Sequence, residues 1–334
     1  LKRHLGSRRL RRPRATAKAQ MSRGEEARAH LEAAQKALQP SWLSLRFQPD
    51  HLTASMEYTQ AANKFRAANM LPDAVGAWLK AAEAKEVCGD LFGAGRAYES
   101  AGQLCESGAA GGDAAGGSAA AVRYWTKGKH CFRVAGKSDV AAKLLLKVAV
   151  LADKEQEIGQ AKEAFEEAID VYLEEEKDHN LGDVYKQYIG FLVRAGLFED
   201  ALKAIDKHIE LLTRQRHAPF VHKELLGKVV LFLHVGDTVR AEAALTPASD
   251  VEGWFQSREC ELGGNLVAAF QAYDEEAVAA VLKEQQFAFL QVEIARLAAK
   301  LRVLGAGPRV GGGEDAAAAD AEATREQDLA DALC

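Results

Sequence analysis

Residues 194–212 read RAGLFEDALKAIDKHIELL and span the end of one helix and the start of the next. Gly196 stands where a helix can stop, because glycine adopts the left-handed cap conformation without a steric penalty. In the helix that follows, apolar side chains recur at spacings of three and four and so share one face. These side chains are Leu202, Ile205, Ile209 and Leu212. The stretch is therefore predicted to be a joint between two helices.

The same joint recurs along the chain. A glycine or asparagine is followed five positions later by alanine at Asn69/Ala74, Gly89/Ala94, Gly136/Ala141, Gly196/Ala201 and Gly236/Ala241. The joints lie 20, 47, 60 and 40 residues apart, close to multiples of a helix plus a turn. Two such helices make a unit of about 40 residues, which is within the range of helical repeats. The sequence therefore predicts an all-α solenoid of helix hairpins, with the apolar helix at 220–235 central in the carboxyl half.

Length and composition narrow the class of protein. The chain has 334 residues, of which 48% are hydrophobic, so it can bury a large core. No run of eighteen apolar residues exists, and a helix that spans a bilayer is not expected. The five cysteines are odd in number and form no CxxC pair, which indicates neither a zinc site nor a disulfide framework. A reduced, cytosolic compartment is the simpler expectation.

The net charge of −5 conceals an asymmetry. Residues 1–20 hold eight Lys and Arg and no acid, and the rest carries 35 basic against 48 acidic side chains. The leader 1–20 is expected to be a disordered basic arm or translated upstream sequence. A contact with an anionic surface and a targeting peptide are the alternatives.

Two further segments depart from the helical pattern. Residues 108–120, GAAGGDAAGGSAA, lack side chains that could pack and are predicted to be a flexible insertion in the solenoid. Residues 305–334 lose the apolar periodicity and carry seven acids against two arginines, which predicts a disordered acidic tail.

The segment 40–50, PSWLSLRFQPD, is bounded by prolines and is unusually apolar for a connector. Its side chains could pack under the first helices as core. They could instead insert into a bilayer or dock a partner, with tryptophan at the interface and Arg46 near lipid phosphates. The apolar residues of this loop are Trp42, Leu43, Leu45 and Phe47.

Basic side chains recur between residues 123 and 137, beside Tyr124 and Trp125. The acidic body of the chain argues against nucleic acid as the partner. A basic stripe that meets acidic helices of a protein partner and a plain solvated surface are the two remaining interpretations. The basic residues are Arg123, Lys127, Lys129, Arg133 and Lys137.

No catalytic or cofactor-binding constellation is found in the sequence. The Gly136–Ser138 triplet, GKS, lacks the glycine and the preceding strand that a phosphate-binding loop needs. The nine histidines form no HExxH pattern, and paired acids such as Glu166 and Glu167 are typical of a solvated helix face. Neither catalysis, a metal, a cofactor nor a small-molecule substrate is expected.

Several segments resemble the family of soluble NSF attachment proteins, and its gamma type most closely. The resemblance covers about residues 23–303 and the extreme terminus. The segments are EYTQAANKF at 57–65, GAGRAYESAGQL at 93–104, RAGLFEDALKAIDKHIEL at 194–211, VLFLHVGDTVRAEAAL at 230–245 and SRECEL at 257–262. SRECEL looks more like the alpha type, and the insertion, the leader and the alanine-rich tail are not features of the family.

The resemblance implies a tetratricopeptide-like solenoid at 21–247 and a carboxyl-terminal helical bundle at 248–304. It implies an adaptor and no enzyme: a protein that coats four-helix SNARE complexes and recruits the hexameric ATPase NSF, which pulls them apart in vesicle traffic. Such a protein would be cytoplasmic and peripheral on vesicle, Golgi or vacuolar membranes. A tetratricopeptide scaffold or co-chaperone that binds peptide tails is the alternative.

The resemblance also implies roles for particular residues. The loop of Trp42, Leu43, Leu45 and Phe47 matches the membrane-attachment loop of the family. Leu333, with Asp328 and Asp331 before it, matches the acidic end that engages and stimulates the ATPase. Lys127, Lys129 and Arg133 are expected on the basic face that grips SNARE helices.

Overall fold

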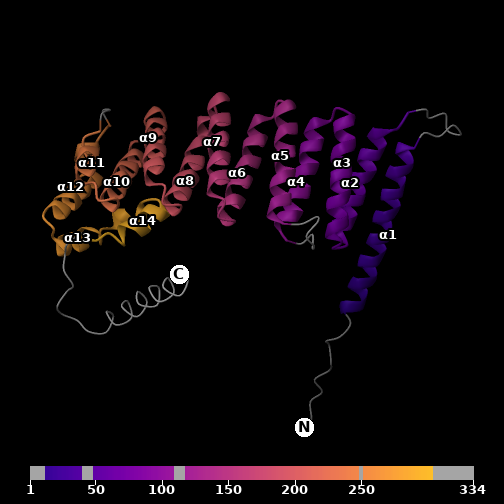
Figure 1. The fold of residues 1–334 in the computed structure, drawn as a ribbon, viewed down its shortest axis with the longest axis horizontal. Coiled ribbons are helices and arrows are strands. Elements are labelled where there is room, and N and C mark those ends of the chain that lie inside the picture. The colour runs from indigo at the N-terminus through magenta and orange to yellow at the C-terminus, as the bar shows by residue number, and fades with distance from the viewer. Residues whose placement is uncertain (1–11, 40–47, 109–116, 248–250, 304–334) are drawn as a thin grey trace, which may run out of the picture. The chain divides into compact units, whose positions relative to one another are not determined.

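The computed structural model describes residues 12–39, 48–108, 117–247 and 251–303, with side chains from residue 20 on. These residues form helices and contain no strand, so the all-α prediction is confirmed (Figure 1). The chain divides into two compact units, Leu1–His217 and Ala218–Cys334. Residues 218–247, which the sequence analysis assigned to the solenoid, thus belong to the second unit.

Unit 1 is a series of helices of nearly equal length joined by short turns. From α2 to α9 the first residues are 20 apart, except for a step of 27 from Leu91 to Ser118. The helices are α1 Arg12–Leu38, α2 His51–Ala67, α3 Leu71–Val87, α4 Leu91–Glu106, α5 Ser118–Val134, α6 Ser138–Lys154, α7 Ile158–Glu174, α8 Asp178–Arg194 and α9 Phe198–Arg214.

Two of these bounds differ from the expectations. Helix α1 starts at Arg12, inside the segment 1–20 that was set apart as a leader. Alanine, arginine and lysine are strong helix formers, and Pro13 is tolerated because it lies in the first turn. Helix α5 starts at Ser118, so the last residues of the Gly/Ala run 108–120 are helical. Residues 109–116 of that run lie outside the described residues.

Each short turn of unit 1, after α2, after α3 and after each helix from α5 to α9, contains one residue in the left-handed region. The N–H that follows it donates to the carbonyl five residues back, as from Leu197 to Leu192 at 2.9 Å and from Lys177 to Tyr172 at 3.0 Å. The predicted joints are therefore confirmed, and three unpredicted ones join them. At these short turns the left-handed residues are Asn69, Gly89, Gly136, Gln156, Glu176, Gly196 and Arg216, with φ between 53° and 76°; Gly108 and Gly117, beside the connection from α4 to α5, also have positive φ, 65° and 106°.

The residue five positions after each of these short-turn residues is fully buried. Because most of these residues are alanine, the helices can approach each other closely at this point. The apolar face predicted for 202–212 is buried as well. In unit 1 the residues five positions on are Ala74, Ala94, Ala141, Ala161, Leu181 and Ala201.

The helices of unit 1 form two rows. Consecutive helices pack against each other from α1 to α9. Helices two apart along the chain are joined by polar contacts at their surface. The odd helices are linked by Lys129–Glu167 and Lys162–Asp200, and the even helices by Lys147–Glu99 and Arg194–Asp153. Each helix thus contacts its neighbours within its own row and the helices of the facing row. This is the arrangement of a helical-hairpin solenoid.

Glycines in α4 let the aromatic side chains of α5 come close. A Cβ placed on Gly95 would lie 2.8 Å from the ring of Phe132. A Cβ on Gly102 would lie 2.4 Å from Nε1 of Trp125. Both aromatic side chains are fully buried, and Nε1 of Trp125 donates to the carbonyl of Glu99 at 3.2 Å. The hairpin that carries the long connection is thus fixed by close packing.

Unit 2 is built around the apolar helix α10, as its sequence predicts. Helix α10 packs against α11, α12 and α14. Trp254 is fully buried in this unit, and its Nε1 donates to the carbonyl of Leu245 at 2.8 Å. The elements are α10 Ala218–His234, α11 Thr238–Ala244, η2 Trp254–Gln256, α12 Arg258–Gln271, α13 Glu275–Val281, η3 Gln285–Phe289 and α14 Val292–Ala298.

Candidate partner-binding face

Helix α5 has an apolar side and a basic side. Tyr124, Trp125 and Phe132 are buried against its neighbours. Four basic residues of the predicted stripe, Arg123, Lys127, Lys129 and Arg133, fall on the remaining surface of α5, because residues one or two apart on a helix point in different directions. The fifth, Lys137, lies beyond α5 and is the N-cap residue of α6. The buried aromatic side chains of α5 therefore direct its basic side chains toward the solvent-exposed side of the helix.

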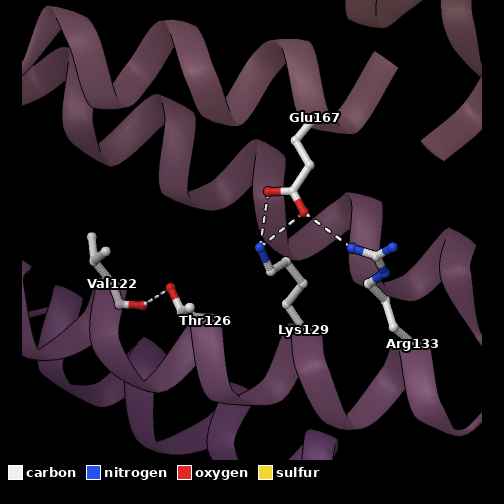
Figure 2. A network of polar contacts seen from close by, with 5 residues as sticks. All are labelled: Val122, Thr126, Lys129, Arg133 and Glu167. Atoms are coloured by element: carbon white, nitrogen blue, oxygen red, sulfur yellow. Dashed lines mark hydrogen bonds and ion pairs between the residues drawn. The ribbon is translucent and has the colours of Figure 1, made fainter. Parts of the chain in front are cut away.

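Lys129 and Arg133 meet on one carboxylate of the next odd helix. Nζ of Lys129 lies 2.9 and 2.8 Å from the two carboxylate oxygens of Glu167, which belongs to α7. Nη1 of Arg133 lies 3.4 Å from Oε1 of the same carboxylate (Figure 2). Since two cations share one anion, the cluster of Lys129, Arg133 and Glu167 keeps one positive charge. Arg133 is half exposed and presents that charge to solvent.

Lys127 lies apart from this cluster. Its Nζ is 5.5 Å from the centre of the Tyr98 ring on α4, a cation–π contact. Of the three basic residues expected to grip a partner, the structure brings Lys129 and Arg133 together and places Lys127 beside α4. Arg123 of the stripe also contacts an aromatic side chain: it lies over the ring of Tyr124 and donates to its hydroxyl at 3.3 Å.

A groove runs beside the cluster, between α5 and α7 and above α6. Its volume is about 160 Å³. Leu144, Leu145 and Val148 of α6 form an apolar floor. Lys129 stands on the α5 wall, and Glu163 and Glu167 stand on the α7 wall.

A second groove occupies the equivalent place one hairpin further on, between α7 and α9 and above α8. Its volume is about 280 Å³. Lys203 and Lys207 lie 40 residues after Glu163 and Glu167. The α9 wall of this groove therefore carries two lysines, beside Asp200, where the α7 wall of the first groove carries two glutamates. Its floor includes Tyr188, whose hydroxyl donates to Glu166 at 2.7 Å. Burial and that hydrogen bond raise the pKa of Tyr188, so it stays a neutral donor.

The outer surface of the odd helices is therefore striped by charge. Helix α7 carries carboxylates toward both grooves, and α5 and α9 carry lysines toward them. Such a surface can bind a helical partner with alternating charges. The contacts would be between exposed charges, so added salt would weaken them. Sequence reasoning identified the α5 cations but assigned Glu167 to a solvated helix face and did not single out Lys203 and Lys207. The 40-residue period, which relates Glu167 to Lys207, was the signal that could have found them.

The remaining predicted site residues lie outside the described residues. This holds for the apolar loop of Trp42, Leu43, Leu45 and Phe47 and for the terminal Asp328, Asp331 and Leu333. The ends of the loop segment are described and lie together, because the N–H of Asp50 donates to the carbonyl of Ala37 at 2.9 Å. The first two turns of α2 then expose Leu52 and Met56, each by more than half.

Two searches of the described residues bear on other classes of site. No group of three or more His, Cys, Asp or Glu among them is placed to hold a metal ion. None of the helices in the described part is long and apolar enough to cross a membrane.

Comparisons with known proteins agree with the resemblance seen in the sequence. The family model described as "Soluble NSF attachment protein, SNAP" matches residues 25–290. The gamma-soluble NSF attachment protein of Dictyostelium discoideum is 22% identical over 260 residues, which are 77% of each chain. That of Arabidopsis thaliana is 23% identical over 256 residues, 77% of this chain and 85% of the relative.

Among solved structures, aspartyl phosphate phosphatase F from Bacillus subtilis aligns with 89% of this chain and 75% of its own. The two are 12% identical with a TM-score of 0.30, a likeness that carries no argument about function.

Proposed function

Because this chain belongs to the soluble NSF attachment protein family, we propose that it is an adaptor for the disassembly of SNARE complexes. In this role it binds the SNARE four-helix bundle and recruits and stimulates the ATPase NSF, whose ATP hydrolysis takes the bundle apart. The observation that carries the proposal is the family match, which extends over 25–290 and thus over helices of both units. The adaptor performs no catalysis itself.

The charge-striped face of unit 1 supports this proposal as the surface that meets the SNARE bundle. The cluster of Lys129, Arg133 and Glu167 has one positive charge in excess and lies beside a groove with an apolar floor. Lys127 lies on the side of α5 that faces α4 and adds a further cation there. Contacts of this kind steer association and set register more than they add affinity.

The apolar loop of Trp42, Leu43, Leu45 and Phe47 is proposed to hold the adaptor on the cytosolic face of vesicle, Golgi or vacuolar membranes. Leu52 and Met56 favour this, since they follow the loop in the sequence and expose apolar side chains at the start of α2. Attachment to the membrane that carries the SNAREs raises the effective concentration of the adaptor. The terminal Asp328, Asp331 and Leu333 are proposed to engage the ATPase.

Reconstituted disassembly tests the function. Membrane-anchored SNARE complexes, NSF and ATP are combined with this chain, and free SNAREs are measured over time. We expect disassembly only when the chain is present, and a chain that ends at Gln327 should still bind SNARE complexes while stimulating ATP hydrolysis much less. Binding of isolated peptide tails without binding of the SNARE bundle would instead identify a co-chaperone scaffold.

The cluster on α5 gives a directional prediction. Glu167→Gln releases two cations and should strengthen SNARE binding, whereas the pair Lys129→Glu and Arg133→Glu should weaken it about tenfold, the effect of ~1.4 kcal/mol. Equilibrium binding is measured by fluorescence anisotropy at low and high salt, and the differences should shrink as salt rises.

The matched control for the cluster is Arg96→Glu, which reverses an exposed cation of α4 in the even row. We expect no change in SNARE binding from this control. If Arg96→Glu weakens binding and the α5 pair does not, the SNARE bundle lies on the even row and the assignment of the face is wrong.

A further inference from the structure

Unit 2 contains a cleft of about 460 Å³ where the ends of α10 and α12 meet residues 300–303. Apolar side chains form its inner surface. Glu275 holds one wall in place, because its carboxylate accepts from the N–H of Val303 at 3.0 Å and lies 3.5 Å from Nε of Arg302. The apolar lining consists of Leu233, Phe270, Leu301 and Val303.

The lining of this cleft has cations and no anions. Lys300 and Arg302 stand at its edge together with His234, and none of the described lining residues is an aspartate or glutamate. Arg302 remains 70% exposed despite its contact with Glu275. The ammonium of Lys300 acts at His234, whose pKa is lowered by burial and by that charge. In a chain of net charge −5, an apolar cleft with this edge fits an acidic peptide that also bears apolar side chains.

The chain itself supplies a segment of that chemistry. Residues 326–334 read EQDLADALC and contain three carboxylates, two leucines and no basic side chain. The described chain ends at Val303, which is part of the cleft wall, and 22 residues separate it from Glu326. At up to ~3.5 Å per residue that span is ample to bring the segment back to its starting point. A segment so tethered competes at an effective concentration on the order of millimolar.

We propose that the cleft lined by Leu233, Phe270, Lys300 and Val303 binds the acidic segment 326–334 of the same chain. The leucines occupy the apolar interior, and Asp328 and Asp331 face Lys300 and Arg302. This binding requires no ATPase or SNARE and goes beyond the proposed function. Where the segment also serves a partner, the cleft and the partner compete for it.

Photo-crosslinking from the last residue tests the proposal in the full chain. A Cys88→Ser, Cys260→Ser background directs labelling to Cys334, because the two other cysteines that remain, Cys105 and Cys131, are buried. A benzophenone attached to Cys334 is irradiated without any partner protein, and the crosslinked peptides are mapped by mass spectrometry. We expect crosslinks within one chain, concentrated at residues 233–238, 270–273 and 300–303.

Charge variants decide whether the cleft recognises the segment. Lys300→Glu should lower the yield of cleft crosslinks about fivefold, as for one charge pair at a protein surface, and Asp328→Lys with Asp331→Lys should restore it. Lys283→Glu, an exposed lysine outside the cleft, should leave the yield unchanged. Crosslinks spread over other surfaces, crosslinks between two chains, or a yield indifferent to Lys300→Glu would each overturn the proposal.

Discussion

Replacing Gly102 with alanine is expected to destabilise unit 1 by about 2–4 kcal/mol. The new Cβ would lie 2.4 Å from Nε1 and 2.5 Å from Cδ1 of Trp125. The indole cannot retreat freely, since it is 1% exposed and its N–H donates to the carbonyl of Glu99. The cost therefore combines overpacking with a weakened buried hydrogen bond. Urea unfolding followed by far-UV circular dichroism measures it.

Two controls separate this contact from the general effect of a glycine substitution. Gly76→Ala changes a helix-interior glycine of α3 whose Cβ would meet nothing within 4 Å, so it should stabilise by about 0.5–1 kcal/mol. In a Trp125→Leu background, Gly102→Ala should cost much less than in the parent chain, because the clashing ring is gone. An equal cost in both backgrounds would mean that the close contact with Trp125 does not set the stability.

Exchanging Trp42, Leu43 and Phe47 for serine together is expected to reduce liposome association about a hundredfold. Partial insertion of three large apolar side chains contributes on the order of 3 kcal/mol, which is lost when they become polar. Co-sedimentation with vesicles that contain anionic lipid measures the effect. Helicity and the urea midpoint should be unchanged if these side chains serve the membrane and not the core.

The comparison for the loop variant is Phe255→Ser, which removes an exposed aromatic side chain of unit 2, 64% accessible. This variant should associate with liposomes as the parent chain does. A fall of the urea midpoint in the loop variant would show that the loop side chains pack as core, and the membrane role would then fail.

The helices of unit 1 could be predicted where the left-handed residue is glycine or asparagine. Gly89, Gly136 and Gly196 mark their turns in the sequence because these positions favour the cap conformation. Gln156, Glu176 and Arg216 adopt the same conformation but carry side chains that give no local signal. There the backbone hydrogen bonds and the packing of the flanking helices impose the turn, at a cost of about 1–2 kcal/mol each.

The candidate site could be predicted only in part, for a related reason. The cations of α5 are visible as a run of lysines and arginines, but Glu167 is 38 residues from Lys129 and belongs to another hairpin. Only the spacing of the helices brings the two side chains together. The clash at Gly102 is likewise invisible in the sequence, since it depends on how closely α4 approaches the ring of Trp125.

The connection between α4 and α5 has a consequence for engineering this chain. Its ends are within hydrogen-bond distance, since the N–H of Gly117 reaches the carbonyl of Cys105 at 3.4 Å. Lengthening a closed loop costs little, about 0.6 kcal/mol for each doubling. A reporter whose own termini lie close together can therefore be spliced between Gly108 and Gly117 while α4 and α5 keep their partners. A fluorescent domain inserted at this position leaves the apolar loop and the acidic segment 326–334 unchanged.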